Sequence, residues 1–315
     1  MREQAKRAVR AALAAWRRAA SASRMRRHAR HVTRADLAAG LARLGVAPGD
    51  ILFVHSSLKS LGYVEGGALA VIGALQDAVG PQGGLLLPTY YLPGGTVRAA
   101  CAMHDYVFDP RRHGTHMGRL PEAFLASAGI HRSVHPTHSV SAWGRHAAHL
   151  TEGHHRAPSI FGMGSPWQRF IGCGEAKVLG LGISMGPVTF YHALEDAMGD
   201  AFPVPVWEET TALLACLDHD GQRWQVPVRP FDPAVAQRRI DHPSRGDLRE
   251  YFHREFDATG LRSNGQVGAA AAWLIPAQAF HAHLRQLASE HVTIYATAAQ
   301  LAARPVPHLL PGHGG

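Results

Sequence analysis

Four short segments of this 315-residue chain combine residue types that can carry chemistry. The first is 55–67, His-Ser-Ser-Leu-Lys-Ser-Leu-Gly-Tyr-Val-Glu-Gly-Gly, which lies between a short apolar run and a periodic apolar stretch. Glycine lets a ligand approach the backbone closely, and the first turn of a helix presents unpaired N–H groups at its positive end. The segment therefore suits a phosphate or a diphosphate. An ordinary strand-to-helix connection explains it equally well, because it is neither a P-loop nor a GxGxxG motif.

The second segment, 131–139, contains His131, His135 and His138 at a spacing that metal ligands can have. No neighbouring carboxylate or thiolate completes a ligand set, and the chain has 22 histidines, so we expect no metal. A single catalytic histidine is the better interpretation, because imidazole titrates near neutral pH. A surface position is the plain alternative for each of these histidines.

The third segment, 182–186, reads Gly-Ile-Ser-Met-Gly and follows an apolar run that is typical of a strand. In this context the GxSxG pattern indicates the nucleophile of a serine hydrolase, here Ser184. Such an enzyme also needs an acid and a histidine later in the chain, for which Asp218 or Asp241 and His242 or His253 are available. A five-residue pattern also arises by chance in a chain with 33 glycines.

The fourth segment contains His192 and Glu195. Their spacing of three places both side chains on one face of a helix, where a carboxylate can orient an imidazole or bind a cation. A solvated helix face is the alternative.

Alternating strands and helices are predicted to position these segments. A helix is expected to begin after Thr33, which can cap free N–H groups, and to end at Gly45. Further helices are predicted at 66–80, 119–128, 189–198 and 277–290. Strands are predicted at 51–54, 85–87, 177–181, 213–218 and 223–228. This order favours a layered α/β fold with ligands beyond the carboxyl ends of the strands, at 55–67, 88–96 and 182–192. The long loop 90–118 is expected to be a lid or a binding loop.

Composition narrows the class of protein. With 46% hydrophobic and 18% charged residues, the chain is not mainly disordered. Its three cysteines are far apart and form no CxxC pair, which argues against a disulfide scaffold and for a reducing compartment. No apolar stretch reaches 18 residues and no secretory signal is visible, so we expect a cytoplasmic protein without an integral membrane segment.

The positive charge is concentrated at the N-terminus. Residues 1–34 contain eleven Lys or Arg and one acid, whereas 35–315 contain 21 basic and 23 acidic side chains. We therefore divide the chain into a basic N-terminal helical extension, 1–34, and a folded domain, 35–315, and expect no nucleic-acid partner. Three interpretations of the extension stay open: a helix that is solvated or packed on the body, an amphipathic helix on anionic lipid or an acidic partner, and a transit peptide.

Several motifs in register resemble the aminoglycoside 3-N-acetyltransferase family of antibiotic acetyltransferases. The matching stretches are LGVAPGDILFVHSSLKSLGYVEGG (44–67), GPQGGLLLPTY (80–90), FDP (108–110), THMG with a following Glu (115–122), RSVHPTHSVSAWG (132–144), GMGSPW (162–167) and KVLGLG with TFYHALE (177–195). They cover about 35–200, and the tail resembles the family only loosely.

The resemblance implies a three-layer α/β/α sandwich, unlike the commoner N-acetyltransferase fold. It also implies direct acetyl transfer from acetyl-CoA to an amine. The 64–67 backbone would hold the diphosphate, and 56–61 would line the pantetheine arm. The residues implied for coenzyme A are His55, Ser56, Ser57, Ser60, Leu61, Gly62, Val64, Glu65, Gly66, Gly67, Thr115 and Met117. Those implied for catalysis are His135, which matches the family's HP motif, and His192 and Glu195, which match its HxxE motif.

The implied chemistry is consistent with these residue types. An amine is protonated at neutral pH, and a histidine that removes its proton typically contributes ~10²–10⁴-fold in rate. A polycationic aminoglycoside benefits from an acidic cleft, but we find no acidic cluster in 90–118 or 200–260. The acceptor therefore stays open between an aminoglycoside and another amino sugar. A hydrolase using Ser184 and a non-enzymatic binding protein using the basic extension are the alternatives, and a homodimer is a candidate assembly.

Overall fold

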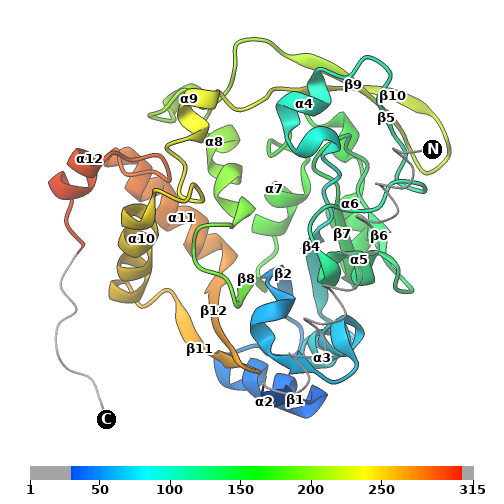
Figure 1. Cartoon of the computed structure of the whole chain (residues 1–315), viewed down its shortest axis with the longest axis vertical. Helices are drawn as coiled ribbons and strands as arrows, with labels where there is room; N and C mark the ends of the chain where they lie inside the picture. The colour runs from blue at the N-terminus through cyan, green and yellow to red at the C-terminus, as the bar shows by residue number, and fades with distance from the viewer. Residues whose placement is uncertain (1–29, 307–315) are drawn as a thin grey trace, which may run out of the picture.

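The structure, a computed structural model, describes residues 30–306, so most of the predicted N-terminal helical extension lies outside the described residues. Its centre is a seven-stranded sheet (Figure 1). In spatial order the strands are β11 (Ser263–Val267), β12 (Ala270–Pro276), β8 (Ala176–Leu181), β2 (Ile51–Ser56), β4 (Gly84–Pro88), β7 (Val140–Gly144) and β6 (His131–Arg132). The three central strands, β8, β2 and β4, are parallel, and β12 and β7 pair antiparallel on either side of them.

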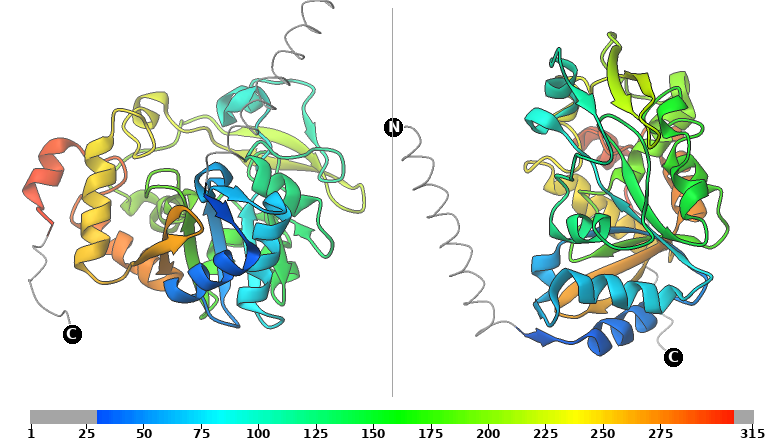
Figure 2. Two further views of the ribbon diagram at one scale, coloured as in Figure 1. Left: turned by 60° about the horizontal axis from the view of Figure 1, so that its bottom comes forward. Right: turned by 90° about the vertical axis from the view of Figure 1, so that its right-hand side faces the viewer.

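Helices cover both faces of this sheet. One face carries α2 (Arg34–Leu44), α3 (Gly67–Val79) and α5 (Arg119–Leu125), and Figure 2 shows α2 and α3 side by side. The other face carries α6 (Ala147–Thr151), α7 (Pro166–Ile171), α8 (His192–Met198), α10 (Gly246–Ala258) and α11 (Ala277–Ser289). Side chains of β2 alternate between the two cores, with Leu52 and Val54 under α2 and α3 and Phe53 on the opposite face. The predicted three-layer α/β/α sandwich is therefore confirmed.

The remaining elements lie around these layers. They are β1 (His31–Val32), β3 (Tyr63–Val64), β5 (Val107–Phe108), β9 (Ala212–Leu217), β10 (Arg223–Val228), α4 (Val97–Cys101), α9 (Pro233–Ala236) and α12 (Ala298–Ala303). Short 3₁₀ helices occupy 58–61, 93–95, 154–156, 189–191 and 199–201. A three-stranded sheet, β10-β9-β5, lies with α4 beyond the carboxyl ends of the central strands (Figure 1).

The ends of α2 agree with the sequence prediction. Thr33 Oγ1 accepts the N–H of Asp36, and the Asp36 carboxylate accepts the N–H of Thr33, which completes a capping box. Gly45 ends the helix with φ of 100°, a left-handed conformation that glycine adopts without strain. The predicted strands of the central sheet are also present, and the predicted strands at 213–218 and 223–228 form the antiparallel pair β9–β10.

Residues just before position 35 already pack with the body. β1 pairs in parallel with β3, where the Tyr63 N–H donates to Arg30 and the Glu65 N–H donates to Val32. The division of the chain at 34/35 stays a prediction. The structure shows in addition that Arg30 and Val32, on the N-terminal side of that boundary, are hydrogen-bonded to the folded domain. The sequence analysis did not predict β7, β11, β12 and α10.

A buried ionic cluster joins the C-terminal helices and carries the first testable prediction. The fully buried Glu255 carboxylate accepts hydrogen bonds from Arg304 (2.7 and 2.9 Å) and from His283 (2.9 Å). Replacing Glu255 by glutamine should destabilise the protein at neutral pH by about 3 kcal/mol, because Arg304 loses its buried counter-charge and keeps only the more exposed Glu290. Thermal unfolding checks this, with Glu250→Gln on the exposed side of the same helix as the control.

The effect of Glu255→Gln should depend on pH. Burial alone would raise the pKa of Glu255, but hydrogen bonds from His283 and Arg304 outweigh burial and hold that pKa below its ordinary value of 4.5. The carboxylate therefore stabilises the fold fully above pH 4.5, and this contribution disappears as the pH falls through the lower pKa of the folded state. A difference between variant and wild type that grows on acidification would contradict this assignment.

Candidate functional site

The predicted functional segments meet at one edge of the central sheet. β2, β4 and β8 are parallel, so the residues that follow them, 57–67, 89–96 and 182–192, leave the sheet on the same side. Because β7 runs antiparallel to β4, the 135–139 turn that precedes β7 also reaches this side. Sheet topology, not proximity in the chain, brings these segments together (Figure 1).

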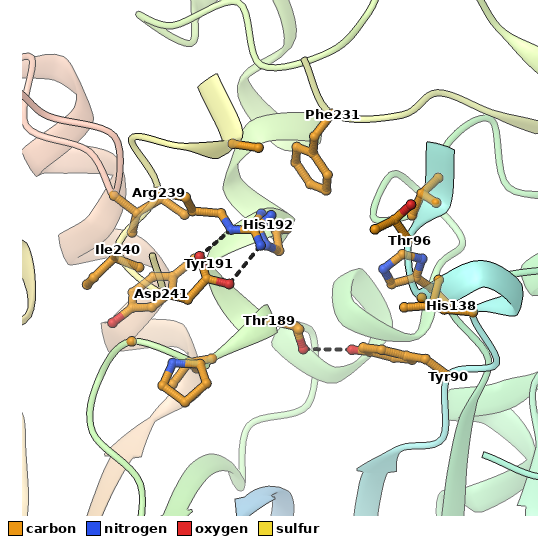
Figure 3. Close-up of a pocket in the computed structure, with 18 of the residues that line it drawn as sticks. Tyr90, Thr96, His138, Thr189, Tyr191, His192, Phe231, Arg239, Ile240 and Asp241 are labelled. Carbon is orange, nitrogen blue, oxygen red and sulfur yellow. Dashed lines mark hydrogen bonds and ion pairs between the residues drawn. The ribbon is translucent and has the colours of Figure 1, made fainter. Parts of the chain in front are cut away.

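A cavity of about 640 Å³ opens at this edge, between the ends of β4 and β8 on one side and α4 and α9 on the other (Figure 3). Among the polar side chains that line it are Tyr90, Thr96, Arg98, His138, Thr189, Tyr191, His192, Arg239 and Asp241. Apolar walls come from Leu92, Val97, Met117, Val188, Phe231, Ile240 and Ile294. The cavity is large enough for a sugar-sized ligand, and mostly apolar walls with a few fixed polar groups are typical of small-molecule sites.

His192 lines the cavity, and one of its ring nitrogens is hydrogen-bonded to a buried carboxylate. Its Nδ1 lies 2.9 Å from Glu195 Oε1, and the same oxygen accepts the Tyr295 hydroxyl at 2.6 Å. Glu195 is buried, and its Oε2 has no hydrogen-bond partner among the described residues. A buried carboxylate next to Nδ1 fixes the proton on that nitrogen, which leaves the Nε2 lone pair of His192 free to accept a proton. Burial and the neighbouring Glu195 raise the pKa of Tyr295 well above its ordinary value, so its hydroxyl stays a donor.

Arg239 and Asp241 form a charged wall beside His192 (Figure 3). Arg239 donates two hydrogen bonds to Asp241, at 2.6 and 2.7 Å, and its guanidinium carbon lies 5.3 Å from the Phe231 ring centre. Burial opposes ionisation of Asp241, but these hydrogen bonds prevail and lower its pKa. Asp241 is the single acidic side chain among the lining residues, and both of its oxygens are already engaged by Arg239.

His135 does not line this cavity. It is buried, its Nδ1 accepts the N–H groups of Thr137 and His138, and its ring stacks on His154 at 4.5 Å. Its Nε2 has no hydrogen-bond partner among the described residues. Burial, together with the nearby imidazoles, lowers the pKa of His135 well below 6.5. The residue of this motif that reaches the cavity is His138, whereas the sequence analysis chose His135 as the catalytic histidine of the segment.

The 55–67 segment lies beside the cavity but does not line it. It packs against the segment after β8, where a Cβ on Gly182 would lie 2.5 Å from Ser60 Cβ. Gly66 and Gly67 both have positive φ, 79° and 61°, and α3 begins at Gly67. A Cβ on Gly67 would meet no atom within 4 Å, so a ligand can approach the start of α3 closely.

Other members of this segment have structural partners. The Glu65 N–H is committed to Val32, so it is not free for a diphosphate as the resemblance implied. The conformation of Gly62, φ 92°, brings its α-carbon against the Arg30 carbonyl, where a Cβ would lie at 2.7 Å. Ser60 donates to Ser57 at 2.9 Å. The structure buries His55, Leu61 and Val64 and leaves Ser56 partly exposed at the end of β2.

Thr115 and Met117 come from the loop before α5. Thr115 donates to the Tyr90 carbonyl at 3.1 Å and accepts the Met117 N–H at 3.1 Å, which places Met117 in the cavity wall. Arg132 holds the same loop in place, because its buried guanidinium donates to the carbonyls of Thr89 and Gly114.

The GxSxG segment has no catalytic triad around it. Ser184 Oγ accepts the Gly186 N–H at 3.3 Å. The nearby His253 accepts the Met185 N–H through Nε2 and faces Arg262 through Nδ1. A hydrolase needs a histidine on the serine and a carboxylate on that histidine, and neither contact is present among the described residues.

Two absences concern the part of the chain that the structure describes. Residues 30–306 contain no group of three His, Cys, Asp or Glu side chains that could hold a metal ion. None of the helices in these residues has the length and apolar character needed to cross a bilayer.

Sequence reasoning missed most of the cavity wall that the tail contributes, including Phe231 and Arg239, as well as Tyr295 on Glu195. Phe231 lies 39 positions from His192 and Tyr295 lies 100 positions from Glu195, the residues that they contact, in a region without a recognisable motif. The available signal was Asp241, which was considered as a hydrolase acid only.

Comparisons with known proteins identify the family. Residues 53–289 match the sequence profile of the family described as aminoglycoside 3-N-acetyltransferase. Aminoglycoside N(3)-acetyltransferase III of Serratia marcescens is 34% identical over 254 residues, which cover 77% of this chain and 92% of that protein. The crystal structure of aminoglycoside acetyltransferase AAC(3)-Xa superposes with a TM-score of 0.68 at 31% identity, covering 84% of this chain and 94% of that one.

A second solved structure, AAC-IIIb in a binary complex with CoASH, superposes with the same TM-score of 0.68 at 26% identity, covering 84% of this chain and 98% of that chain. The profile match spans the α/β core, the 135–139 turn and the His192–Glu195 pair, and it extends through α11. This chain therefore belongs to the aminoglycoside 3-N-acetyltransferase family and is an N-acetyltransferase.

Proposed function

We propose that this enzyme transfers the acetyl group of acetyl-CoA to an amine of an aminoglycoside or another amino sugar, with His192 as the general base. The observation that carries the proposal is the His192–Glu195 pair in the cavity wall, 2.9 Å between Nδ1 and Oε1. This assignment replaces His135, which has no access to the cavity. Glu195 keeps its place as the residue that orients the imidazole.

The proton and electron movements need no side-chain nucleophile. The substrate ammonium first loses one proton to solvent. His192 Nε2 then accepts a second proton from the resulting amine, while the amine nitrogen forms its bond to the acyl carbon and the carbonyl π-electron pair moves onto the oxygen. The carbon–sulfur bond then breaks, and His192 returns the proton to the sulfur. Glu195 stabilises the imidazolium that exists between these two transfers, and Tyr295 keeps the carboxylate in place. Ser184 takes part in none of these steps.

The start of α3 is the proposed site for the diphosphate of coenzyme A. The helix is 13 residues long, its first N–H groups lack helical partners, and the space above Gly67 is open. The CoASH complex of the relative AAC-IIIb supports coenzyme A as the ligand of this fold. Since 57–67 and the cavity lie at the same sheet edge, a long, flexible cofactor suits the separation between the α3 site and His192.

Acetyl-CoA should stabilise the protein against thermal unfolding, by about 2.7 kcal/mol at a concentration of 100 times Kd. Gly67→Asp should abolish most of this stabilisation, because it places a negative charge where the diphosphate binds. Asparagine has the same shape and tolerates the left-handed conformation equally well, so Gly67→Asn is the matched control. If acetyl-CoA stabilises both variants equally, the start of α3 is not the diphosphate site.

A thiol-release assay with acetyl-CoA identifies the acceptor. The relatives named above point to aminoglycosides, whereas the single acid in the cavity wall is already paired with Arg239, which favours amino sugars of lower charge. The panel should contain aminoglycosides and simple amino sugars, and turnover of either class supports the proposed function. No thiol release with any amine of the panel would reject it.

A further inference from the structure

A second histidine lies in the cavity, and the proposed mechanism leaves it unused. His138 is only 6% exposed and occupies the wall opposite His192 (Figure 3). Its ring lies 4.6 Å from the Tyr90 ring centre and makes an edge contact with Phe161 at 5.3 Å. These contacts give the imidazole a fixed place in the wall.

Hydrogen bonds within the 135–138 turn determine which nitrogen of His138 carries the proton. His135 Nδ1 accepts two backbone N–H groups, from Thr137 at 3.2 Å and from His138 at 3.0 Å. Thr137 Oγ1 lies 3.0 Å from His138 Nδ1 and 3.3 Å from His135 Nδ1. Because two donors already share the His135 lone pair, we assign the Thr137 hydroxyl as the donor to His138 Nδ1. This assignment puts the proton of His138 on Nε2.

The electrostatic surroundings keep this imidazole neutral. Burial, reinforced by His192, His154 and Arg239, lowers the pKa of His138 well below 6.5. A neutral ring with a proton on Nε2 is a hydrogen-bond donor there and has no lone pair to offer the ligand. His192 has the opposite arrangement, because Glu195 holds its proton on Nδ1. Of the two histidines in the cavity wall, His192 thus offers a proton acceptor and His138 a hydrogen-bond donor.

We propose that His138 is a further catalytic residue, whose Nε2–H donates a hydrogen bond to the carbonyl oxygen of the transferred acyl group. When the amine forms its bond to the acyl carbon, the π-electron pair of the carbonyl moves onto that oxygen. A fixed donor stabilises this developing charge more than the neutral ground state. Two other donors that line the cavity already have partners, the Tyr90 hydroxyl with Thr189 at 2.7 Å and Arg98 with Glu208. This inference rests on the proposed function.

Substitutions at position 138 distinguish a hydrogen-bond donor from a proton-accepting base at this position. Glutamine places an amide N–H near the position of Nε2 but accepts no proton, so His138→Gln should keep kcat within about tenfold of wild type. His138→Ala should lower kcat by about 10²- to 10³-fold, the usual loss for one such donor, without a matching rise in KM for acetyl-CoA. His131→Ala, an exposed histidine of the same segment, is the control and should leave kcat unchanged.

A second measurement tests the tautomer without turnover. In the free protein labelled with ¹⁵N-histidine, the resonances of His138, identified by their loss in His138→Gln, should report a neutral ring with its proton on Nε2 at pH 7. Thr137→Val removes the hydroxyl that fixes this tautomer and should shift the ring toward a mixture of both forms. A proton on Nδ1, or a charged ring, would overturn the assignment.

The outcomes distinguish this inference from the proposed function. If the wild type transfers acetyl groups and His138→Ala does so equally well, the inference is wrong and the proposed function stands. The inference is also wrong if His138→Gln is as inactive as His138→Ala, because the residue then needs a proton-accepting ring. Absence of acetyl transfer by the wild type rejects both.

Discussion

Replacing His192 by alanine is expected to lower kcat by about 10²- to 10⁴-fold, the range that a general base contributes. The variant leaves the attacking amine with no side chain positioned to accept its proton. The cavity position and the 2.9 Å contact with Glu195 support this role. Thiol release under saturating acetyl-CoA and acceptor measures the effect.

The fold of the His192→Ala variant is checked by its thermal unfolding and by the stabilisation that acetyl-CoA provides. Both should stay close to wild type, because the proposed diphosphate site at the start of α3 consists of other residues. His149→Ala, at an exposed histidine of α6, is the matched control and should keep full activity. A His192→Ala enzyme with wild-type kcat would exclude His192 as the base.

Replacing Glu195 by glutamine is expected to lower kcat by about 10²- to 10⁴-fold, although the substitution changes little in shape. An amide N–H next to Nδ1 favours the tautomer with the proton on Nε2, so the lone pair of His192 turns away from the amine. The imidazolium also loses its counter-charge. KM for acetyl-CoA should change little, because Glu195 lies behind His192 and outside the cavity lining.

Tyr295→Phe is the matched comparison for Glu195→Gln. It removes the hydroxyl that donates to the same Oε1 atom at 2.6 Å but leaves the carboxylate beside His192. Its effect on kcat should be much smaller than that of Glu195→Gln, because the carboxylate still selects the productive tautomer. Equal losses in both variants would mean that Glu195 acts through packing and not through the orientation of His192.

The sequence by itself determined the features that depend on neighbouring residues. The capping box of Thr33 and the glycine end at position 45 specify α2, because a helix end is stabilised by groups within three or four positions. The His192–Glu195 pair followed from helical spacing in the same way. Apolar runs identified β2, β4 and β8, and the rule for parallel sheets then placed their loops at one edge.

Only the tertiary structure decided which histidine of the 131–139 segment reaches the cavity. A non-helical turn has no fixed period, so sequence spacing does not specify where His135 and His138 point. Backbone N–H groups of the turn bind the ring of His135 and hold it inside, while Tyr90 and Phe161 hold His138 in the wall.

The rest of the site depends on contacts between distant parts of the chain. Tyr295 reaches Glu195 across 100 positions, and Arg239 with Asp241 forms a cavity wall from the tail, where no motif marked them. The antiparallel pairing of β7 with β4 and of β12 with β8 was also unpredicted, because buried strands of either direction have the same apolar character. Local sequence specifies individual elements, but packing of the whole chain selects the side chains that meet in the cavity.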